Sequence, residues 1–394
     1  MVQPLLPAAS IPRKTCKLFG AIKALSTIRR SVVLVHGPKG CVYHINYILG
    51  MRGDRPSEIY TTALDEHDII FGAGEKLIAA IEELDQSLRP ELLFVLSCCS
   101  SGIIGEDVEQ AARVAVTGAR VLAVSAGGFE GDYHDGYQET LCQLVEQLAK
   151  EGLPVEPRTV NLVGMLRAGP DLSEIRRLLG QVGVRVNAVL TADASRDELE
   201  RLGAASLSIV LCEPSGKEAA DLLRDRCGVP YTIEEIPIGH QATTLFLSRV
   251  AGSLGIPIPG PVEPDQVPDS RLLRGRRIAI VSGPTRAVSM TRFLNEIGVP
   301  PRLVVVDIDS SVREKIEKLV SPEGEVLIEP SCDLILQKLE EHQIDLLIGG
   351  MLELPLARAR GIDHIDMMHG SQKTVGPAGA ANLVRLCGRR RAPE

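Results

Sequence analysis

The sequence predicts an α/β protein in which parallel sheets are flanked by helices, and in which this arrangement occurs three times. Short apolar runs rich in β-branched residues alternate with amphipathic helical patterns along the 394 residues. Such alternation is typical of parallel sheets whose strands are joined by helices. The pattern also restarts twice, each time after a segment rich in proline and glycine, and such segments favour domain boundaries. We therefore expect three similar α/β domains.

The first domain is predicted at residues 1–153, with strands near 32–35, 92–96 and 121–124. The middle domain follows at 154–262, with strands near 160–163, 184–190 and 207–211. A linker at 255–264 contains four prolines and two glycines and marks the second boundary. The last domain, 263–394, has strands near 276–282, 303–306 and 346–348.

Composition excludes several classes of function. The net charge is −8 and only 3% of the residues are aromatic, so we expect no nucleic-acid partner. No charge-free run has the length of a membrane span, and no signal-peptide pattern is apparent. We therefore expect a cytoplasmic protein that does not enter a membrane. In that compartment its nine cysteines stay reduced, which favours metal ligands, catalysts or core residues over disulfides.

Sulfur and imidazole groups gather where the predicted strands end. Cys41 follows the run at 32–35, Cys98 and Cys99 follow 92–96, Cys212 follows 207–211, and His369 follows 365–368. Parallel sheets bind ligands at the carboxyl ends of their strands, and a helix N-terminus stabilises a thiolate there. This placement predicts a soft metal centre. Taken singly, a cysteine in an apolar context is more often a small core residue than a ligand, and only the grouping of several at strand ends makes the two interpretations comparable.

Several short motifs occur in a fixed order from Cys16 almost to the C-terminus. They are Cys16-x-x-x-Gly20-Ala21, His36-Gly-Pro-x-Gly-Cys41, Asp65-Glu-His-Asp-Ile-Ile-Phe-Gly72, Cys99 ahead of Ile104-Gly105-Glu106-Asp107, and Gly128-Phe129-x-Gly131. With this ordered set the chain resembles the component 1 proteins of nitrogenase and their relatives. The resemblance implies a nitrogenase component 1-like fold of three Rossmann-like domains.

The resemblance also implies a cluster in the first domain. In that family three cysteines bind an interfacial iron–sulfur cluster, of the P-cluster or [4Fe–4S] type, shared with a partner subunit. Cys16, Cys41 and Cys99 fall on those positions. Cys99 keeps the family's interval to Ile104-Gly105, while Cys98 is left either to replace it or to pack inward. The expected partner is a homologous second subunit in an α2β2 assembly, although a second copy of this chain is the other arrangement.

A second set of residues matches the buried multi-iron cofactor of the catalytic subunits. Cys212 falls on the cysteine ligand and His369 close to the histidine ligand. Because the interval from His369 to Gly376 is one residue longer than in the family, His364 is the alternative. Gln372 and Lys373 are candidates for binding an organic acid on the cofactor.

Proton delivery is the expected role of Tyr133 and His134, in the segment that the family places over the cofactor. An exposed turn rich in glycine and aspartate is the other interpretation of this segment.

The resemblance, with both Cys212 and His369 retained, implies the catalytic subunit of a nitrogenase-like reductase. The chain has no Gly-x-x-x-x-Gly-Lys-Ser/Thr motif, so nucleotide hydrolysis is expected in a separate iron protein that supplies electrons. The chain is shorter than a usual nitrogenase catalytic subunit, which suits the methylthio-alkane reductases, enzymes that cleave carbon–sulfur bonds of small thioethers. A cofactor-assembly scaffold, a dinitrogen reductase and a tetrapyrrole reductase of the same family are the alternatives.

Overall fold

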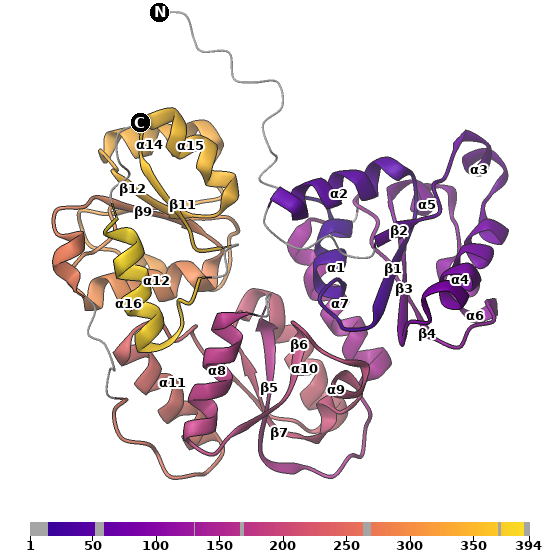
Figure 1. Cartoon of the computed structure of the whole chain (residues 1–394), viewed down its shortest axis with the longest axis horizontal. Coiled ribbons are helices and arrows are strands. Elements are labelled where there is room, and N and C mark those ends of the chain that lie inside the picture. The colour runs from indigo at the N-terminus through magenta and orange to yellow at the C-terminus, as the bar shows by residue number, and fades with distance from the viewer. Residues whose placement is uncertain are drawn as a thin grey trace, which may run out of the picture.

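The computed structural model describes residues 15–51, 59–129, 131–165, 169–262, 269–368 and 372–389. Within these ranges the strands form three separate sheets of four, four and five strands, and every strand pair is parallel (Figure 1). Helices cover both faces of each sheet. The predicted fold class is therefore confirmed.

The first sheet has the order β2-β1-β3-β4. Its strands are β1 (Ser31–His36), β2 (Ile59–Thr61), β3 (Leu92–Ser97) and β4 (Arg120–Val124). One face packs on α1 (Lys17–Leu25), α2 (Lys39–Met51) and α7 (Tyr133–Leu148). The other packs on α4 (Gly74–Leu88) and α6 (Val108–Val114), while the short helices α3 (Glu66–Phe71) and α5 (Cys99–Ile104) lie in the connections. Both faces of the sheet are covered, so its strands are almost continuously apolar.

The middle sheet has the order β6-β5-β7-β8. Its strands are β5 (Glu156–Met165), β6 (Arg185–Thr191), β7 (Ala205–Val210) and β8 (Tyr231–Ile233). Helix α10 (Glu213–Cys227) covers the face toward the first domain, with the short helix α9 (Arg196–Glu200) beside it. Helices α8 (Pro170–Gln181) and α11 (His240–Ser253) cover the other face.

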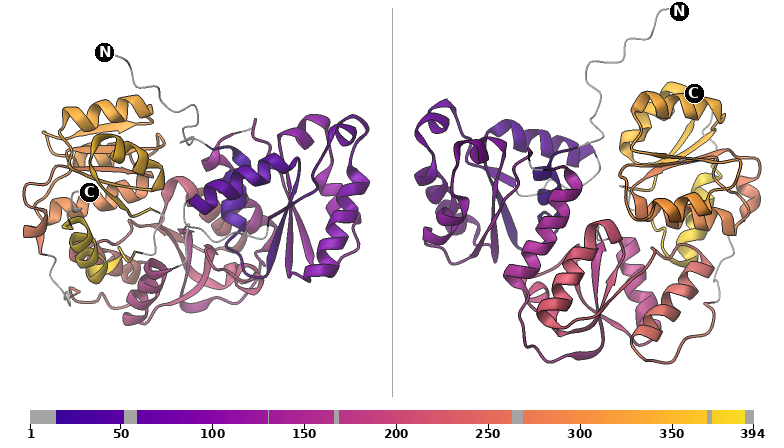
Figure 2. Two further views of the ribbon diagram at one scale, coloured as in Figure 1. Left: turned by 45° about the horizontal axis from the view of Figure 1, so that its top comes forward. Right: turned by 180° about the vertical axis from the view of Figure 1, so that it is seen from behind.

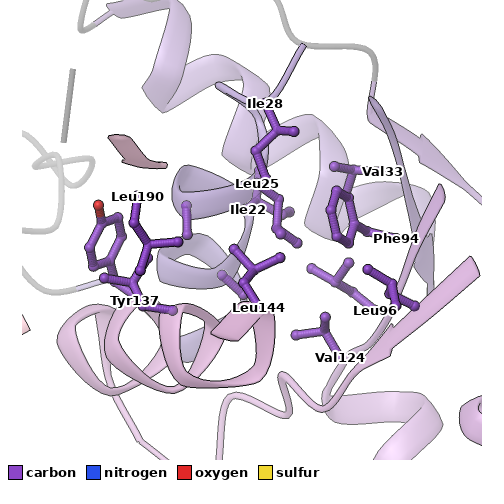
Figure 3. Close-up of a cluster of buried hydrophobic side chains, with 14 of the residues drawn as sticks. Ile22, Leu25, Ile28, Val33, Phe94, Leu96, Val124, Tyr137, Leu144 and Leu190 are labelled. Carbon is purple, nitrogen blue, oxygen red and sulfur yellow. The ribbon is translucent and has the colours of Figure 1, made fainter. Parts of the chain in front are cut away.

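The first and middle domains share one hydrophobic core. Ile22 and Leu25 of α1 lie between Phe94 of the first sheet and Leu190 of the middle sheet, with Leu144 of α7 beside them (Figure 3). All five side chains are almost fully buried. Because the core is continuous across α1 and α7, these two domains are held together by hydrophobic burial.

The last sheet has the order β11-β10-β9-β12-β13. Its strands are β9 (Ile278–Ser282), β10 (Leu303–Val306), β11 (Glu325–Ile328), β12 (Leu346–Gly349) and β13 (Asp363–Asp366). Helices α12 (Pro284–Glu296), α13 (Arg313–Leu319) and α16 (Gly376–Cys387) pack on one face. Helices α14 (Cys332–Glu341) and α15 (Leu354–Arg360) pack on the other.

The three domains are arranged so that the carboxyl ends of the strands of all three sheets face a common space. The first and last domains lie on either side of the middle domain (Figures 1 and 2). In each sheet the connections change direction between two central strands, namely β1 and β3, β5 and β7, and β9 and β12. Ligands of doubly wound sheets bind beyond the carboxyl ends of such strand pairs. These three places are where the candidate residues lie.

No helix in the described part of the chain combines the length and the apolar character that a bilayer crossing requires.

Candidate metal centres

Four cysteines meet at the carboxyl edge of the first sheet. Cys98 and Cys99 directly follow β3, and Cys41 lies in the first turn of α2, just after β1. Cys16 is the N-cap residue of α1, so it precedes a helix, and its backbone forms an isolated bridge with Asp132. The three cysteines that were predicted to share a cluster therefore lie together, with Cys98 among them.

The backbone of Gly128 lies next to both Cys16 and Cys99. Its backbone N–H donates to Cys99 Sγ at 3.2 Å. A Cβ placed on Gly128 would lie 2.8 Å from Cys99 Sγ and 3.2 Å from Cys16 Cβ. Any side chain here would fill the space beside the two sulfurs, so the approach of the backbone requires glycine.

Cys98 and Cys41 form a second pair. The hydrogen bond from the Cys41 thiol lowers the pKa of Cys98 to about 5, outweighing burial, which acts in the opposite direction. The same hydrogen bond, together with burial, raises the pKa of Cys41. Cys98 is almost completely buried, and a Cβ on Gly37 would overlap with its Sγ. A glycine again makes room for a sulfur.

His36 closes the inner side of this group. Its ring is fully buried, with Nδ1 3.0 Å from Oγ1 of Thr62 and Nε2 3.8 Å from a carboxylate oxygen of Glu106. Burial lowers the pKa of His36 even though Glu106 acts to raise it, so the ring is neutral at pH 7. Glu106 also accepts a hydrogen bond from the Ala73 N–H at 2.5 Å, which gives this carboxylate a structural role.

Four thiols are the number that an iron–sulfur cluster takes. In the part of the chain that the structure describes, no three His, Cys, Asp or Glu side chains converge on one ion position. Cysteines that bind an iron–sulfur cluster are attached to different iron atoms and need not converge on one point. Glycines at positions 37 and 128, together with an N–H group aimed at a sulfur, fit such a ligand set.

A second candidate centre is a cavity of about 290 Å³ between the three domains. The first domain contributes Lys23, Asp132, Tyr133 and His134 to its wall, and the middle domain contributes Met165, Cys212 and Ser215. The last domain contributes the turn after β9, together with Asp307, Glu353, Met367, Met368 and Gln372. Residues from all three sheet edges therefore surround one space.

Cys212 stands where β7 ends and α10 begins, facing this cavity. It is the N-cap residue of α10, and its Sγ donates to Ser215 Oγ at 3.4 Å. A Cβ on Gly164, at the end of the neighbouring strand β5, would lie 3.0 Å from Cys212 Cβ. Gly164 also has φ +78°, which favours glycine. The predicted cofactor cysteine is thus presented to the cavity by a close backbone approach.

Tyr133 and His134 line the cavity from the first turn of α7. The helix begins there because Asp132 accepts a hydrogen bond from the His134 N–H at 2.8 Å and forms a capping box with Asp135. The Tyr133 and His134 rings meet edge to face with centroids 5.2 Å apart. The two residues are therefore fixed at a helix start and are not part of an exposed turn.

The predicted histidine ligand lies outside the described residues, because the description stops at Met368 and resumes at Gln372. Met368 and Gln372 both line the cavity. The alternative, His364, is on β13, where Nε2 lies 2.9 Å from the Gly350 carbonyl oxygen. It is not among the residues that line the cavity.

A group of polar contacts, here named the Asp171 clamp, joins α8 of the middle domain to the last domain. Its members are Asp171, Glu174, Arg286, Lys373 and Thr374. One carboxylate oxygen of Asp171 accepts from the Thr374 N–H at 2.7 Å and the Val375 N–H at 3.0 Å. The other accepts from Thr374 Oγ1 at 2.8 Å and Arg286 at 3.4 Å.

Lys373 is also part of this clamp, since its ammonium lies 3.0 Å from the buried carboxylate of Glu174. Burial acts to raise the pKa of Glu174, but hydrogen bonds from Arg177 and Lys373 outweigh it and leave the pKa below its ordinary value. Gly376, with φ +76°, leaves room for this carboxylate, since a Cβ there would lie 2.8 Å from it. The structure thus gives Lys373 a partner within the chain.

Comparison with known proteins agrees with the geometry. A family model described as nitrogenase component 1 type oxidoreductase matches residues 16–388. The chain belongs to the nitrogenase component 1 type oxidoreductase family. The match begins at Cys16 and spans all three sheets, so it includes every candidate ligand discussed above.

Within this family the chain is similar to proteins of two kinds. It is 29% identical to the nitrogenase iron-molybdenum cofactor biosynthesis protein NifE of Clostridium pasteurianum, over 96% of this chain and 87% of that protein. It is 27% identical to the nitrogenase molybdenum-iron protein beta chain of Methanothermobacter thermautotrophicus (strain ATCC 29096 / DSM 1053 / JCM 10044 / NBRC 100330 / Delta H), over 90% and 86%. The solved structure "Nitrogenase Cp1 at pH 6.5" has the same fold, with a TM-score of 0.83, 20% identity, and coverage of 98% of this chain and 93% of that one.

Several residues at the centres of this nitrogenase-family chain were not predicted from the sequence. Asp171, Glu174 and Arg286 form a clamp with residues distant in the chain, and Lys23 reaches the cavity wall from α1. Charged residues on amphipathic helices are ordinarily solvated, so their position in the sequence gave no signal. The glycines at 37, 128 and 164 lie next to predicted ligands, and that proximity was the available signal.

Proposed function

We propose that this chain is the catalytic subunit of a nitrogenase-like reductase, which receives electrons from an ATP-hydrolysing iron protein and uses them on a small molecule at the inter-domain cavity. The observation that carries the proposal is that Cys212, Tyr133 and His134 face one cavity bounded by all three domains. A soft metal ligand and two proton-bearing groups are therefore in the same space. This is the combination that proton-coupled reduction requires.

The family membership supports two clusters on this chain. A P-cluster-like iron–sulfur cluster would be held by Cys16, Cys41 and Cys99, and a complex iron–sulfur cofactor by Cys212 and His369. When bound, these groups store electrons and pass them to substrate. In the cavity, Cys212 would hold the cofactor, while the apolar side chains of Met165, Met367 and Met368 would limit the access of water to it.

A partner subunit is supported by apolar side chains exposed around the first cysteine group. Tyr43 and Tyr47 on α2, Ile103 on α5 and Phe129 beside Gly128 are between 55% and 78% exposed. Exposed apolar groups gathered near one place are typical of interaction surfaces. A homologous second subunit covering this surface would complete the expected α2β2 assembly.

Proton transfer is proposed for Tyr133 and His134. An imidazole has two ring nitrogens, so His134 is able to accept a proton on one side and donate it on the other. The phenol of Tyr133 lies beside it and extends the path. Gln372 lines the wall, whereas Lys373 is paired with Glu174, so an organic acid on the cofactor would compete with that carboxylate.

The substrate class that we propose is the small methylthio-alkanes. Reductive cleavage of such a thioether consumes two electrons and two protons. The carbon–sulfur bond breaks, and new S–H and C–H bonds give a thiol and a hydrocarbon. The electrons come from the iron protein and the protons from the cavity wall. Thioether side chains of three methionines in that wall offer a compatible surface.

The test is anaerobic metal analysis with EPR on the protein prepared with its partner subunit. We expect Cys212→Ala to lose one EPR signal, a large share of the iron, and the reduction of methylthio-alkanes, while the first cluster stays. Cys142→Ala, in the half-buried middle of α7, is the matched control and should behave as wild type. Unchanged iron in Cys212→Ala would overturn the proposal.

A cofactor-assembly scaffold is the second candidate, because curated relatives of comparable similarity are cofactor biosynthesis proteins. A scaffold would pass the cluster of the cavity to an acceptor protein and would reduce no substrate. Incubation of the loaded protein with an acceptor that lacks cofactor distinguishes the two functions. Retention of the cluster together with substrate turnover favours the reductase.

A further inference from the structure

Helices α1 and α7 are far apart in the sequence but begin side by side (Figure 1). The residues that precede them, Cys16 and Asp132, form an isolated antiparallel bridge. The Tyr133 N–H donates to the Thr15 carbonyl oxygen at 3.0 Å. Cys16 belongs to the first cysteine group, whereas Tyr133 lines the cavity. The junction of these two helices therefore connects the two candidate centres.

Two glycines make this close approach possible, one on each helix. Gly20 is the fourth residue of α1, and a Cβ on it would overlap with the carbonyl oxygen of Tyr133, the first residue of α7. Gly136 is the fourth residue of α7, and a Cβ on it would overlap with the carbonyl oxygen of Lys17, the first residue of α1. Because atoms in ordinary contact lie about 3.5–4 Å apart, a side chain at either position would separate the helices by about 1 Å.

The contact at Gly20 also fixes the first turn of α7. A Cβ on Gly20 would lie 2.7 Å from the Tyr137 nitrogen, and in an α-helix this N–H group donates to the carbonyl of Tyr133, four residues earlier. The Tyr133 ring packs on Phe19 of α1, with centroids 5.8 Å apart, and on the His134 ring, with centroids 5.2 Å apart. The positions of Tyr133 and His134 at the cavity wall therefore depend on how closely α7 approaches α1.

We propose that Gly20 and Gly136 are positioning residues of the reduction. Their contact holds Tyr133 and His134 at the cavity wall in a fixed position relative to Cys16. The inference rests on the proposed function, in which Tyr133 and His134 transfer protons. A proton donor must lie about 2.6–3.2 Å from the group that receives the proton, and a misplacement of about 1 Å can lower a rate by about 100-fold. A single methyl group between α1 and α7 would therefore slow proton delivery while both clusters remain bound.

The first test is amide hydrogen exchange on the full chain without metal, so it does not depend on the proposed function. Helix starts ordinarily fray and exchange fast, but the Tyr133 N–H of the unaltered chain should exchange within about tenfold of the Leu144 N–H in the middle of α7. Gly20→Ala should raise the exchange rate of Tyr133 by about 100-fold and leave that of Leu144 nearly unchanged. Gly136→Ala acts on the same contact from the other helix and should give the same result.

Helix propensity alone predicts the opposite, because alanine is a better helix former than glycine. Gly252→Ala in α11 is the control, since no atom lies within 4 Å of its Cβ position, and it should leave the exchange of Tyr133 unchanged. Unchanged protection of Tyr133 in Gly20→Ala would overturn the proposal. So would exchange typical of a frayed helix start in the unaltered chain, a result that needs no substitution.

The second test uses the loaded protein with its partner subunit. In Gly20→Ala we expect kcat for methylthio-alkanes to fall by about tenfold with KM unchanged, while iron content and both EPR signals match wild type. The kinetic solvent isotope effect should rise, because proton transfer becomes slower. A merely structural role would lower the amount of active protein and leave the isotope effect unchanged, and that result would overturn the proposal. A wild-type protein without turnover would refute the proposed function, whereas the exchange measurement would still decide this inference.

Discussion

The two candidate centres of this molecule are built in different ways. The first group, Cys16, Cys41, Cys98 and Cys99, comes entirely from the first domain, around the ends of β1 and β3. The cavity around Cys212 takes its wall from all three domains. One site is therefore fixed by the local fold of one sheet, and the other by the packing of three sheets against each other.

The two centres therefore depend on different structural features. The first group needs only short connections after two neighbouring strands and glycines that let sulfur approach. The cavity also needs the last domain to stay against the middle domain, which is the contribution of the Asp171 clamp. Changes at the clamp should therefore affect the cavity and leave the first group intact.

Among substitutions that leave both clusters bound, we expect the largest loss of turnover from a change at His134. His134→Gln keeps the approximate size and polarity of the side chain but removes the imidazole, which can both accept and donate a proton. General acid–base catalysis contributes about 10²–10⁴-fold, so we expect turnover to fall by about 100-fold. Iron content and both EPR signals should match wild type. Loss of iron would mean that His134 holds the cofactor and does not deliver protons.

The next largest effect is expected from Asp171→Asn. The amide replaces one acceptor oxygen with a donor that faces Arg286, so the hydrogen bond and ion pair on that side are lost. Hydrogen bonds to charged groups are worth about 1.5–3 kcal/mol, and we expect stability to fall by about 2 kcal/mol. Iron at the cavity should decrease while the first cluster is retained.

Thermal unfolding and site-resolved EPR measure these two outcomes for the clamp. Asp309→Asn is the matched control, because Asp309 is exposed and pairs only with Arg313 of its own domain in the described structure. Loss of the first cluster in Asp171→Asn would contradict the independence of the two centres.

Substitution of a glycine next to either centre should lower the bound iron at that centre alone, by less than the changes described above. Gly128→Ala places a Cβ 2.8 Å from Cys99 Sγ and should lower iron only in the first group. Gly164→Ala adds strain of about 1–2 kcal/mol at φ +78° and crowds Cys212, so it should lower iron only in the cavity. Gly40→Ala, in α2 next to Cys41 and with no atom within 4 Å of its Cβ position, is the control. Equal losses at both centres in either variant would refute the separation.

The smallest effect is a pH dependence at the clamp. The pKa of Glu174 lies below its ordinary value in the folded chain, so its ion pair stabilises the fold above about pH 4.3, the usual pKa of a free Glu. That stabilisation is lost as the pH falls through the lowered folded pKa. The metal-free protein should lose melting temperature below pH 4.3 more steeply than Glu174→Gln does. Parallel curves for the two proteins would show that Glu174 carries no such linkage.

The central strands could be predicted from the sequence, whereas four edge strands were missed. Central strands such as β1 and β3 are buried on both faces and read as continuous apolar runs. The missed strands β2, β8, β11 and β13 have three or four residues and are mostly half-buried. They lie at sheet edges, where one neighbour and partial burial leave an apolar run that is absent or only three residues long, as in β11.

The positions of the candidate cysteines were predictable for a related reason. Each follows a strand or opens a helix, so its place at a sheet edge follows from the local pattern. The clamp could not be predicted, since Asp171 and Thr374 are 203 residues apart and meet only when the last domain packs on the middle one. The boundaries predicted at 153 and 262 remain predictions, as do the roles assigned to the site residues.

The most direct test is anomalous diffraction at the iron edge from anaerobic crystals of the protein with its partner subunit. Our account predicts two separate groups of iron peaks for each copy of this chain. One should lie beside Cys16, Cys41, Cys98 and Cys99, and the other in the cavity next to Cys212. A single group of peaks, or iron at neither set of cysteines, would contradict the claim that one chain carries two centres of different construction.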